Sequence, residues 1–167
     1  MINQAGRSSL RPLYLLAAAI VLLEAIILAL VLPLQPGGFA LQFIATPRGF
    51  GEIIHVWSPG QLARYRSHLP VDGLLLLAYG SFGWLCVQRV SFYQRLSPWV
   101  RRCGAALLPL AAAFDAVENS LHWWLTEVPR FGMPGVYLAS ASCAALKWLL
   151  VLGFAAFSLW ALARQPE

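Results

Sequence analysis

The chain of 167 residues is 59% hydrophobic and only 11% charged, whereas soluble proteins average about 45–50% apolar and about 25% charged residues. This shortage of charge excludes a water-soluble surface and predicts a single transmembrane domain over residues 1–167. The net charge of +5 comes from arginines at the ends of apolar runs, which is typical of anchoring at lipid headgroups and not of nucleic-acid binding.

The first apolar run predicts a transmembrane helix over residues 12–33. An α-helix needs about 20 residues to cross a hydrocarbon core of about 30 Å. The run follows Arg7 and Arg11, as the apolar region of a signal peptide follows basic residues. It is longer than that region, which has only about 7–15 residues, and no clear small-residue cleavage site follows it. We therefore expect a retained helix, with Glu24 near its centre.

Residues 34–70 predict an extracytoplasmic lid of two short amphipathic helices on the outer leaflet. In TPRGFGEIIHVW, Thr46 is a favoured N-cap and Pro47 a favoured first helical residue. Apolar residues then recur at helical spacing, namely Phe50, Ile53, Ile54 and Trp57. SPGQLARYRSHL repeats this helix start, and its polar side would hold Arg64, Arg66 and His68. A soluble hairpin outside the membrane is the alternative for this segment.

Three further apolar runs predict helices over residues 71–93, 98–125 and 135–163. Each is long enough to cross a bilayer, and none shows the alternation of a strand. Helices also satisfy their own backbone hydrogen bonds, as lipid requires. The expected fold class is an all-α integral membrane protein, with a four-transmembrane-helix bundle and short amphipathic helices in the outer loop between the first two.

More arginines flank one side of the predicted bundle than the other. One side has Arg7, Arg11, Arg89, Arg95, Arg101, Arg102 and Arg164, and the other has Arg48, Arg64, Arg66 and Arg130. Because arginine-rich segments stay in the cytoplasm, this distribution predicts a protein of the bacterial inner (cytoplasmic) membrane with both termini in the cytoplasm.

Polar residues interrupt the apolar run FDAVENSLHWWL at residues 114–125. They recur at i, i+3, i+4 and i+7, which places them on one helix face: Asp115, Glu118, Asn119 and His122. At 1.5 Å per residue, Asp115, Lys147 and Glu24 lie near the midplane. Tyr79 lies slightly outward of it, and Asp72 lies at the outer end of its helix.

A charge at the bilayer centre costs about 2.5–3.5 kcal/mol, so the central charges should face inward and meet. Lys147 would pair with one of three acids, Glu24, Asp115 or Glu118. The surplus acids would hold protons or bind a cation. We therefore expect a buried polar pocket that opens to the outer face, beneath the lid.

Three short motifs form a recognisable pattern: an Asp followed by a Tyr in VDGLLLLAYG, D-x-x-E-N in DAVEN, and a lone Lys in ALKWLL. The pattern resembles an uncharacterised family of small bacterial four-helix integral membrane proteins, and it spans most of the chain. The resemblance implies a shared polar set, namely Asp72, Tyr79, Asp115, Glu118, Asn119 and Lys147. It implies no reaction.

The predicted function is the binding or modification of a lipid-like hydrophobic ligand in this pocket. The groups suited to acid/base catalysis are Asp115, Glu118, Lys147 and Tyr79. The groups expected to contact the ligand are Asp72, Asn119, His122, Trp57 and Glu24. The expected partners are a membrane lipid or another hydrophobic small molecule and, as a further partner, a membrane protein. The sequence leaves open whether a reaction is catalysed.

Two other functions fit the same residues. An accessory or assembly subunit of a larger membrane complex would use the polar core only to fix helix packing. A proton-coupled carrier would use the surplus acids, but the helices lack the visible repeats and central breaks that many carriers show.

No metal or other cofactor is expected. Asp115, Glu118 and His122 lie on one helix face, but zinc favours more histidine or cysteine ligands. A nearby Lys147 would repel magnesium or calcium, although these ions accept carboxylates. Haem would need a second histidine at membrane depth beside His122.

Overall fold

The computed structural model describes residues 4–164, and every regular element in that range is helical. Four long helices dominate the fold, namely α1 (Gln4–Val31), α3 (Pro59–Arg89), α5 (Pro98–Leu125) and α6 (Pro134–Ala163). Three short elements connect them, namely η1 (Gly38–Phe43), α2 (Pro47–Val56) and α4 (Ser91–Gln94). The all-helical prediction is therefore confirmed.

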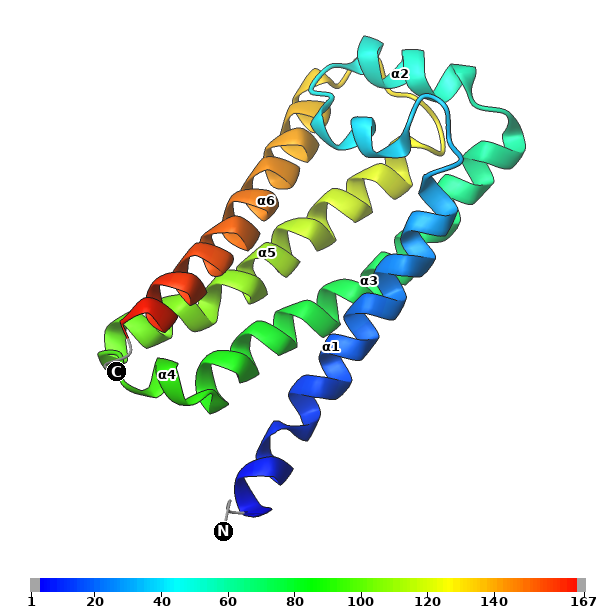
Figure 1. The fold of residues 1–167 in the computed structure, drawn as a ribbon. Coiled ribbons are helices and arrows are strands. Elements are labelled where there is room, and N and C mark those ends of the chain that lie inside the picture. Colours follow the sequence, from blue (N-terminus) through cyan, green and yellow to red (C-terminus); the bar gives the residue numbers. More distant parts are fainter. Residues whose placement is uncertain (1–3, 165–167) are drawn as a thin grey trace.

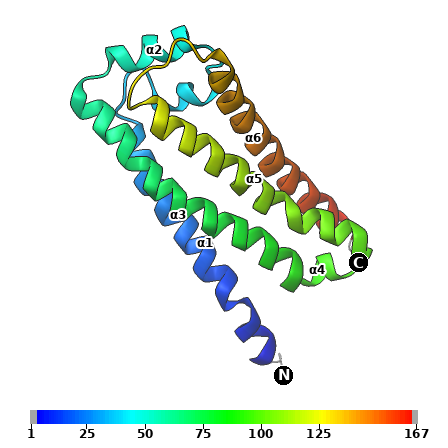
Figure 2. The same cartoon turned by 180° about the vertical axis from the view of Figure 1, so that it is seen from behind.

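The long helices form an open row rather than a closed ring (Figures 1 and 2). Each runs antiparallel to the next, so that α1 packs along α3, α3 along α5, and α5 along α6. Within residues 4–164, α3 is the one long helix along which α1 packs. One side of the molecule, between α1 and α6, is consequently left without a helix-to-helix seam.

Three of the helices are long and apolar enough to cross a membrane. They are the Leu10–Val31 part of α1, Pro59–Arg89 and Pro134–Ala163. These helices support a multi-pass membrane protein, as expected from the composition. With 28 residues α5 is as long as α1, but Asp115, Glu118 and Asn119 reduce its mean hydropathy. A fourth span therefore stays a prediction.

The lid, defined as residues 32–58 with η1 and α2, covers one end of the row. The start of α2 is the one predicted, since Thr46 accepts a hydrogen bond from the Gly49 backbone N–H at 3.2 Å. Its apolar side chains are buried as expected, namely Phe50, Ile53 and Ile54. They join Leu125 and Tyr137 in one hydrophobic core, which fixes the lid to the end of α5 and the start of α6.

The second amphipathic helix of the predicted lid does not exist as a separate element. Ser58 caps it in a capping box with Gln61, but the helix runs through Pro70 to Arg89. The predicted boundary lay between Pro70 and Val71, where the apolar run begins, but Pro70 lies inside the helix. Helices in lipid tolerate proline, and the buried Leu69 beside it holds the helix in place across it.

The other predicted boundaries differ from the structure by smaller amounts. The predicted helix 98–125 has the bounds of α5, and 135–163 starts one residue after Pro134. The expected 12–33 ends two residues beyond Val31, and α1 begins earlier, at Gln4. The predicted 71–93 runs past Arg89 into α4, where the chain turns before α5.

Candidate functional site

A buried ion triad lies between α5 and α6 and consists of Asp115, Glu118 and Lys147. The Lys147 Nζ is 3.0 Å from Asp115 Oδ1 and 2.7 Å from Glu118 Oε2. The i, i+3 spacing on α5 presents both carboxylates to the same ammonium. All three residues are at most 7% exposed. Lys147 thus meets two of its three expected counter-ions.

Two hydrogen bonds join α5 to α3, one at the triad and one at the neighbouring Asn119. The Tyr79 hydroxyl donates to Asp115 Oδ2 at 3.0 Å, so Asp115 holds Lys147 with one oxygen and Tyr79 with the other. Nearer the lid, the Asn119 amide donates to Asp72 Oδ2 at 2.6 Å. Tyr79, Asn119 and Asp72 are each half-buried. The predicted polar residues of α3, α5 and α6 therefore form one connected region.

Glu24 differs from the expectation that it faces inward, because it lies exposed on α1. Through space, the Glu24 carboxylate is repelled by Asp115 and attracted by Lys147, and Glu24 and Asp72 repel each other. Within the described range Glu24 has no ion-pair partner. The reason is the open row: α1 packs along α3, so the middle of α1 borders the gap beside α6.

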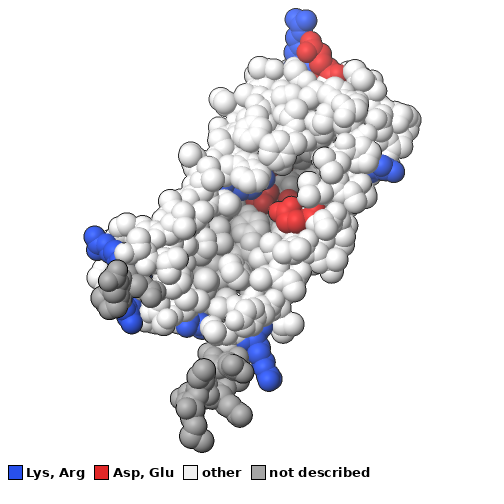
Figure 3. Space-filling model, in the orientation of Figure 1, with Lys and Arg blue, Asp and Glu red and all other residues white. Residues whose placement is uncertain are grey.

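The polar cluster is the ion triad together with Glu24, Asp72, Tyr79 and Asn119. Figure 3 shows acidic and basic atoms gathered at a hollow in the middle of one face, whose surroundings are uncharged. The cluster contains one ammonium group and four carboxyl groups, two of which pair with that ammonium. Its negative charge therefore exceeds its positive charge wherever the remaining carboxyls are ionised.

A second polar group lies above the triad, toward the lid. The Tyr65 hydroxyl and His122 Nδ1 are 2.7 Å apart, and His68 Nδ1 donates a hydrogen bond to the Tyr65 carbonyl. All three side chains are buried. The other ring nitrogen of His122, Nε2, is buried without a hydrogen-bond partner among the described residues. His122 thus faces the interior, one turn beyond Glu118.

The sequence did not indicate Tyr65 and His68 as site residues. His68 was expected on the polar outer side of the lid, beside Arg64 and Arg66, but it is 7% exposed. The prediction was wrong because it ended the helix at Pro70. Along one continuous helix, positions 65, 68, 72 and 79 share a face, and this spacing would have joined His68 to Asp72 and Tyr79.

Trp57 lies in the lid core, away from the charged groups. Its indole N–H donates to the Pro36 carbonyl at 3.0 Å, and its ring lies 5.0 Å from that of Tyr65. The structure therefore links Trp57 to the site only through Tyr65 and His122. Its contacts are those of a residue that orders the lid.

The donor set within residues 4–164 offers no group of three His, Cys, Asp or Glu side chains placed to hold a metal ion. The three α5 side chains that share one helix face are divided between two partners. Asp115 and Glu118 face Lys147, whereas His122 faces Tyr65.

Similarity to other proteins adds nothing to this geometry. The resemblance to small bacterial four-helix membrane proteins therefore stays a prediction. The chain matches no family model, no curated protein and no solved structure.

Proposed function

We propose that the protein binds a lipid-like amphiphile with a cationic head, which enters the polar cluster from the lipid between α1 and α6. One observation carries the proposal: the cluster has four carboxyl groups for one ammonium, and Glu24 lies unpaired on the open side. A ligand with an amine or quaternary ammonium head would supply the missing positive charge.

The cost of an unpaired charge in lipid supports this choice of ligand. An isolated ionised carboxylate at the bilayer centre costs about 2.5–3.5 kcal/mol. A cationic head bound beside Glu24 and Asp72, which interact electrostatically, would offset that cost for both. The hydrocarbon part of the ligand would remain in the bilayer, which removes the need for a closed apolar pocket.

The route of entry in this proposal is lateral, whereas the sequence suggested an opening to the outer face. At that face, the lid buries Leu34, Leu41 and Phe50 against Leu125 and Tyr137. The side between α1 and α6 has no such packing. Entry from the bilayer also suits a ligand that is itself dissolved in lipid.

The proposed setting is the bacterial inner membrane, with α5 as a fourth span and both termini in the cytoplasm. The position of α5 between α3 and α6 supports the fourth span, as does the burial of its Asp115, Glu118 and His122. The arginine-rich end, which includes Arg95 and Arg164, would face the cytoplasm. The lid would then lie at the outer surface.

Binding is the better supported half of the predicted function. The four groups expected to act in acid/base catalysis already satisfy one another, because Asp115 holds both Lys147 and Tyr79, and Lys147 also holds Glu118. A general acid or base must reach the proton that it moves. Glu24 and Asp72 are the carboxyl groups of the polar cluster that lie outside the triad. A bound head group can contact them without breaking an ion pair.

Native mass spectrometry of the full chain, released gently from its own membranes, tests the proposal. We expect one reproducible adduct of a cationic lipid-like mass. Glu24→Gln should abolish the adduct without loss of folding, because the Glu24 side chain is exposed and has no ion pair among the described residues. Glu52→Gln is the matched control, since Glu52 is an exposed acid that pairs with Arg48 in the lid.

Three results would contradict the proposal. Bare protein in every preparation would mean that protons, and not a ligand, neutralise the carboxyl groups of Glu24 and Asp72. That result would favour a structural or proton-carrying role. An adduct that survives Glu24→Gln would belong to another site. A second protein chain held in place of a lipid, and lost in Glu24→Gln, would identify an accessory subunit whose partner supplies the cation.

A further inference from the structure

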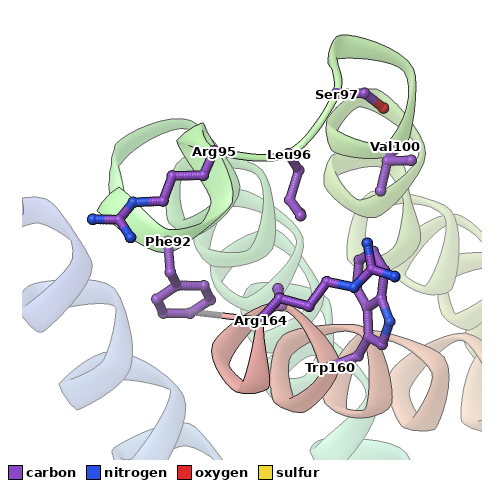
Figure 4. A pocket seen from close by; sticks show the side chains of 8 residues that line it. Phe92, Arg95, Leu96, Ser97, Val100, Trp160 and Arg164 are labelled. Carbon is purple, nitrogen blue, oxygen red and sulfur yellow. The ribbon is translucent and has the colours of Figure 1, made fainter. Parts of the chain in front are cut away.

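A cavity lies at the end of the molecule opposite the lid. It has a volume of about 330 Å³ and lies between the end of α4, the start of α5 and the end of α6. Arg95 and Arg164 border it from two helix ends, and Figure 4 shows their guanidinium groups extending in opposite directions, with that of Arg164 over Trp160; Phe92 and Trp160 are the aromatic residues of its wall. None of the polar cluster residues lines it.

The charged side chains that the structure describes at this end are all basic. This end carries Arg11, Arg89, Arg95, Arg101, Arg102 and Arg164, and the sequence has no Asp or Glu between residues 73 and 114 or between residues 128 and 164. Among the described residues, neither Arg95 nor Arg164 forms an ion pair. The Arg164 guanidinium lies 4.5 Å from the centre of the Trp160 ring, which leaves its N–H groups available to an anion.

Helix-end electrostatics explain part of this arrangement. Arg95 and Arg164 each directly follow a helix, where the helix dipole favours a cation. That effect accounts for the charge of each residue, but it requires neither a cavity nor the convergence of two helix ends on one.

An apolar cleft adjoins the cavity. It has a volume of about 200 Å³ and shares Val100 with the cavity. Its other walls are Trp99, Leu107 and Phe157 together with Cys103 and Gly104. A basic cavity at the helix ends thus continues into an apolar cleft between α5 and α6. These two environments match the two parts of one phospholipid.

We propose that the basic cavity and the adjoining apolar cleft together hold one anionic phospholipid. Its phosphate lies in the cavity between Arg95 and Arg164, whose exposed side chains turn toward it on binding, so that each guanidinium can bind phosphate oxygens in pairs. The start of one acyl chain occupies the cleft beside Trp99 and Phe157. The inference is independent of the proposed function, because it concerns a different end of the molecule and a ligand of opposite charge.

Retention of lipids of known headgroup by the full chain tests this site. Native mass spectrometry from mixed micelles would compare phosphatidylglycerol with phosphatidylethanolamine carrying the same acyl chains. We expect the protein to retain phosphatidylglycerol preferentially. In the variant Arg95→Gln/Arg164→Gln, binding should weaken about 25-fold, since each arginine near an anionic lipid contributes roughly fivefold in affinity.

A control of equal charge separates a site from general attraction. Arg48→Gln/Arg64→Gln also removes two exposed arginines but at the lid end, and it should leave phosphatidylglycerol retention unchanged. Equal weakening by both double variants would overturn the proposal, as would equal retention of the two lipids by the unmodified protein.

A further variant distinguishes a phospholipid from free phosphate. Leu107→Trp should fill the apolar cleft and reduce phosphatidylglycerol retention while Arg95 and Arg164 remain. Retention that is unaffected by Leu107→Trp, or that inorganic phosphate abolishes, would show an anion site without a lipid and would overturn the proposal.

Discussion

Replacing Lys147 by Met is expected to lower the free energy of unfolding by about 3–5 kcal/mol, which is the usual cost of removing one partner from a buried ion pair. Lys147 is 7% exposed and lies within 3.0 Å of two carboxylates. Met has a similar length and no charge, so packing changes little while Asp115 and Glu118 lose their counter-ion. Reversible unfolding in mixed micelles measures the difference.

A neutralised triad provides the control for this substitution. In Lys147→Met/Asp115→Asn/Glu118→Gln no charge remains to be compensated, and buried ion triads can be replaced by neutral groups at little or no cost in stability. We therefore expect most of the lost free energy to return. A Lys147→Met variant as stable as the parent would show that the triad does not contribute as its geometry indicates.

Replacing Phe50 by Ala is expected to lower the free energy of unfolding by a comparable amount, about 3–5 kcal/mol. Phe50 on α2 packs against α5 and α6, with its ring centroid 5.6 Å from that of His122 and 5.2 Å from that of Tyr137. It is 1% exposed. The substitution would leave a cavity between the lid, the end of α5 and the start of α6.

Phe43→Ala is the matched control in the same lid. Phe43 is 50% exposed on η1, so its removal should change the free energy of unfolding by less than about 0.5 kcal/mol. Hydrogen exchange of the lid provides a second measure, since Phe50→Ala should release α2 before the long helices. Equal effects of the two substitutions would contradict the assignment of Phe50 as the anchor of the lid.

Local sequence chemistry predicted the helices and their starts better than their continuity. Thr46-Pro47 and Ser58-Pro59 each begin a helix in the structure, because the hydroxyl side chain caps the first turn and the following proline suits it. Leu69-Pro70 has no hydroxyl residue before its proline, and Pro70 lies inside α3. Its effect depends on the burial of Tyr65, His68 and Leu69, which only the tertiary structure decides.

The candidate site was predicted in its residues more than in its arrangement. Helical spacing placed Asp115 and Glu118 on one face, and the cost of buried charge required Lys147 to meet an acid. Which acid depends on how each helix is rotated and which helix lies beside it. Glu24 was expected inside because a charge at the bilayer centre is costly. It is exposed instead, because α1 packs along α3 at the end of an open row. A periodic pattern does not distinguish a row from a ring.

Carboxyl labelling by an apolar carbodiimide in the bilayer tests the central claim most directly, namely that a cationic amphiphile reaches the polar cluster from the lipid. Such a reagent adds to a protonated carboxyl group to form a stable acylurea, which peptide mass spectrometry locates. We predict that Glu24 is labelled first, that Asp115 and Glu118 are protected by Lys147, and that a long-chain quaternary ammonium slows labelling where the matching alcohol does not. An unlabelled Glu24, or labelling that the ammonium amphiphile leaves unchanged, would contradict the account.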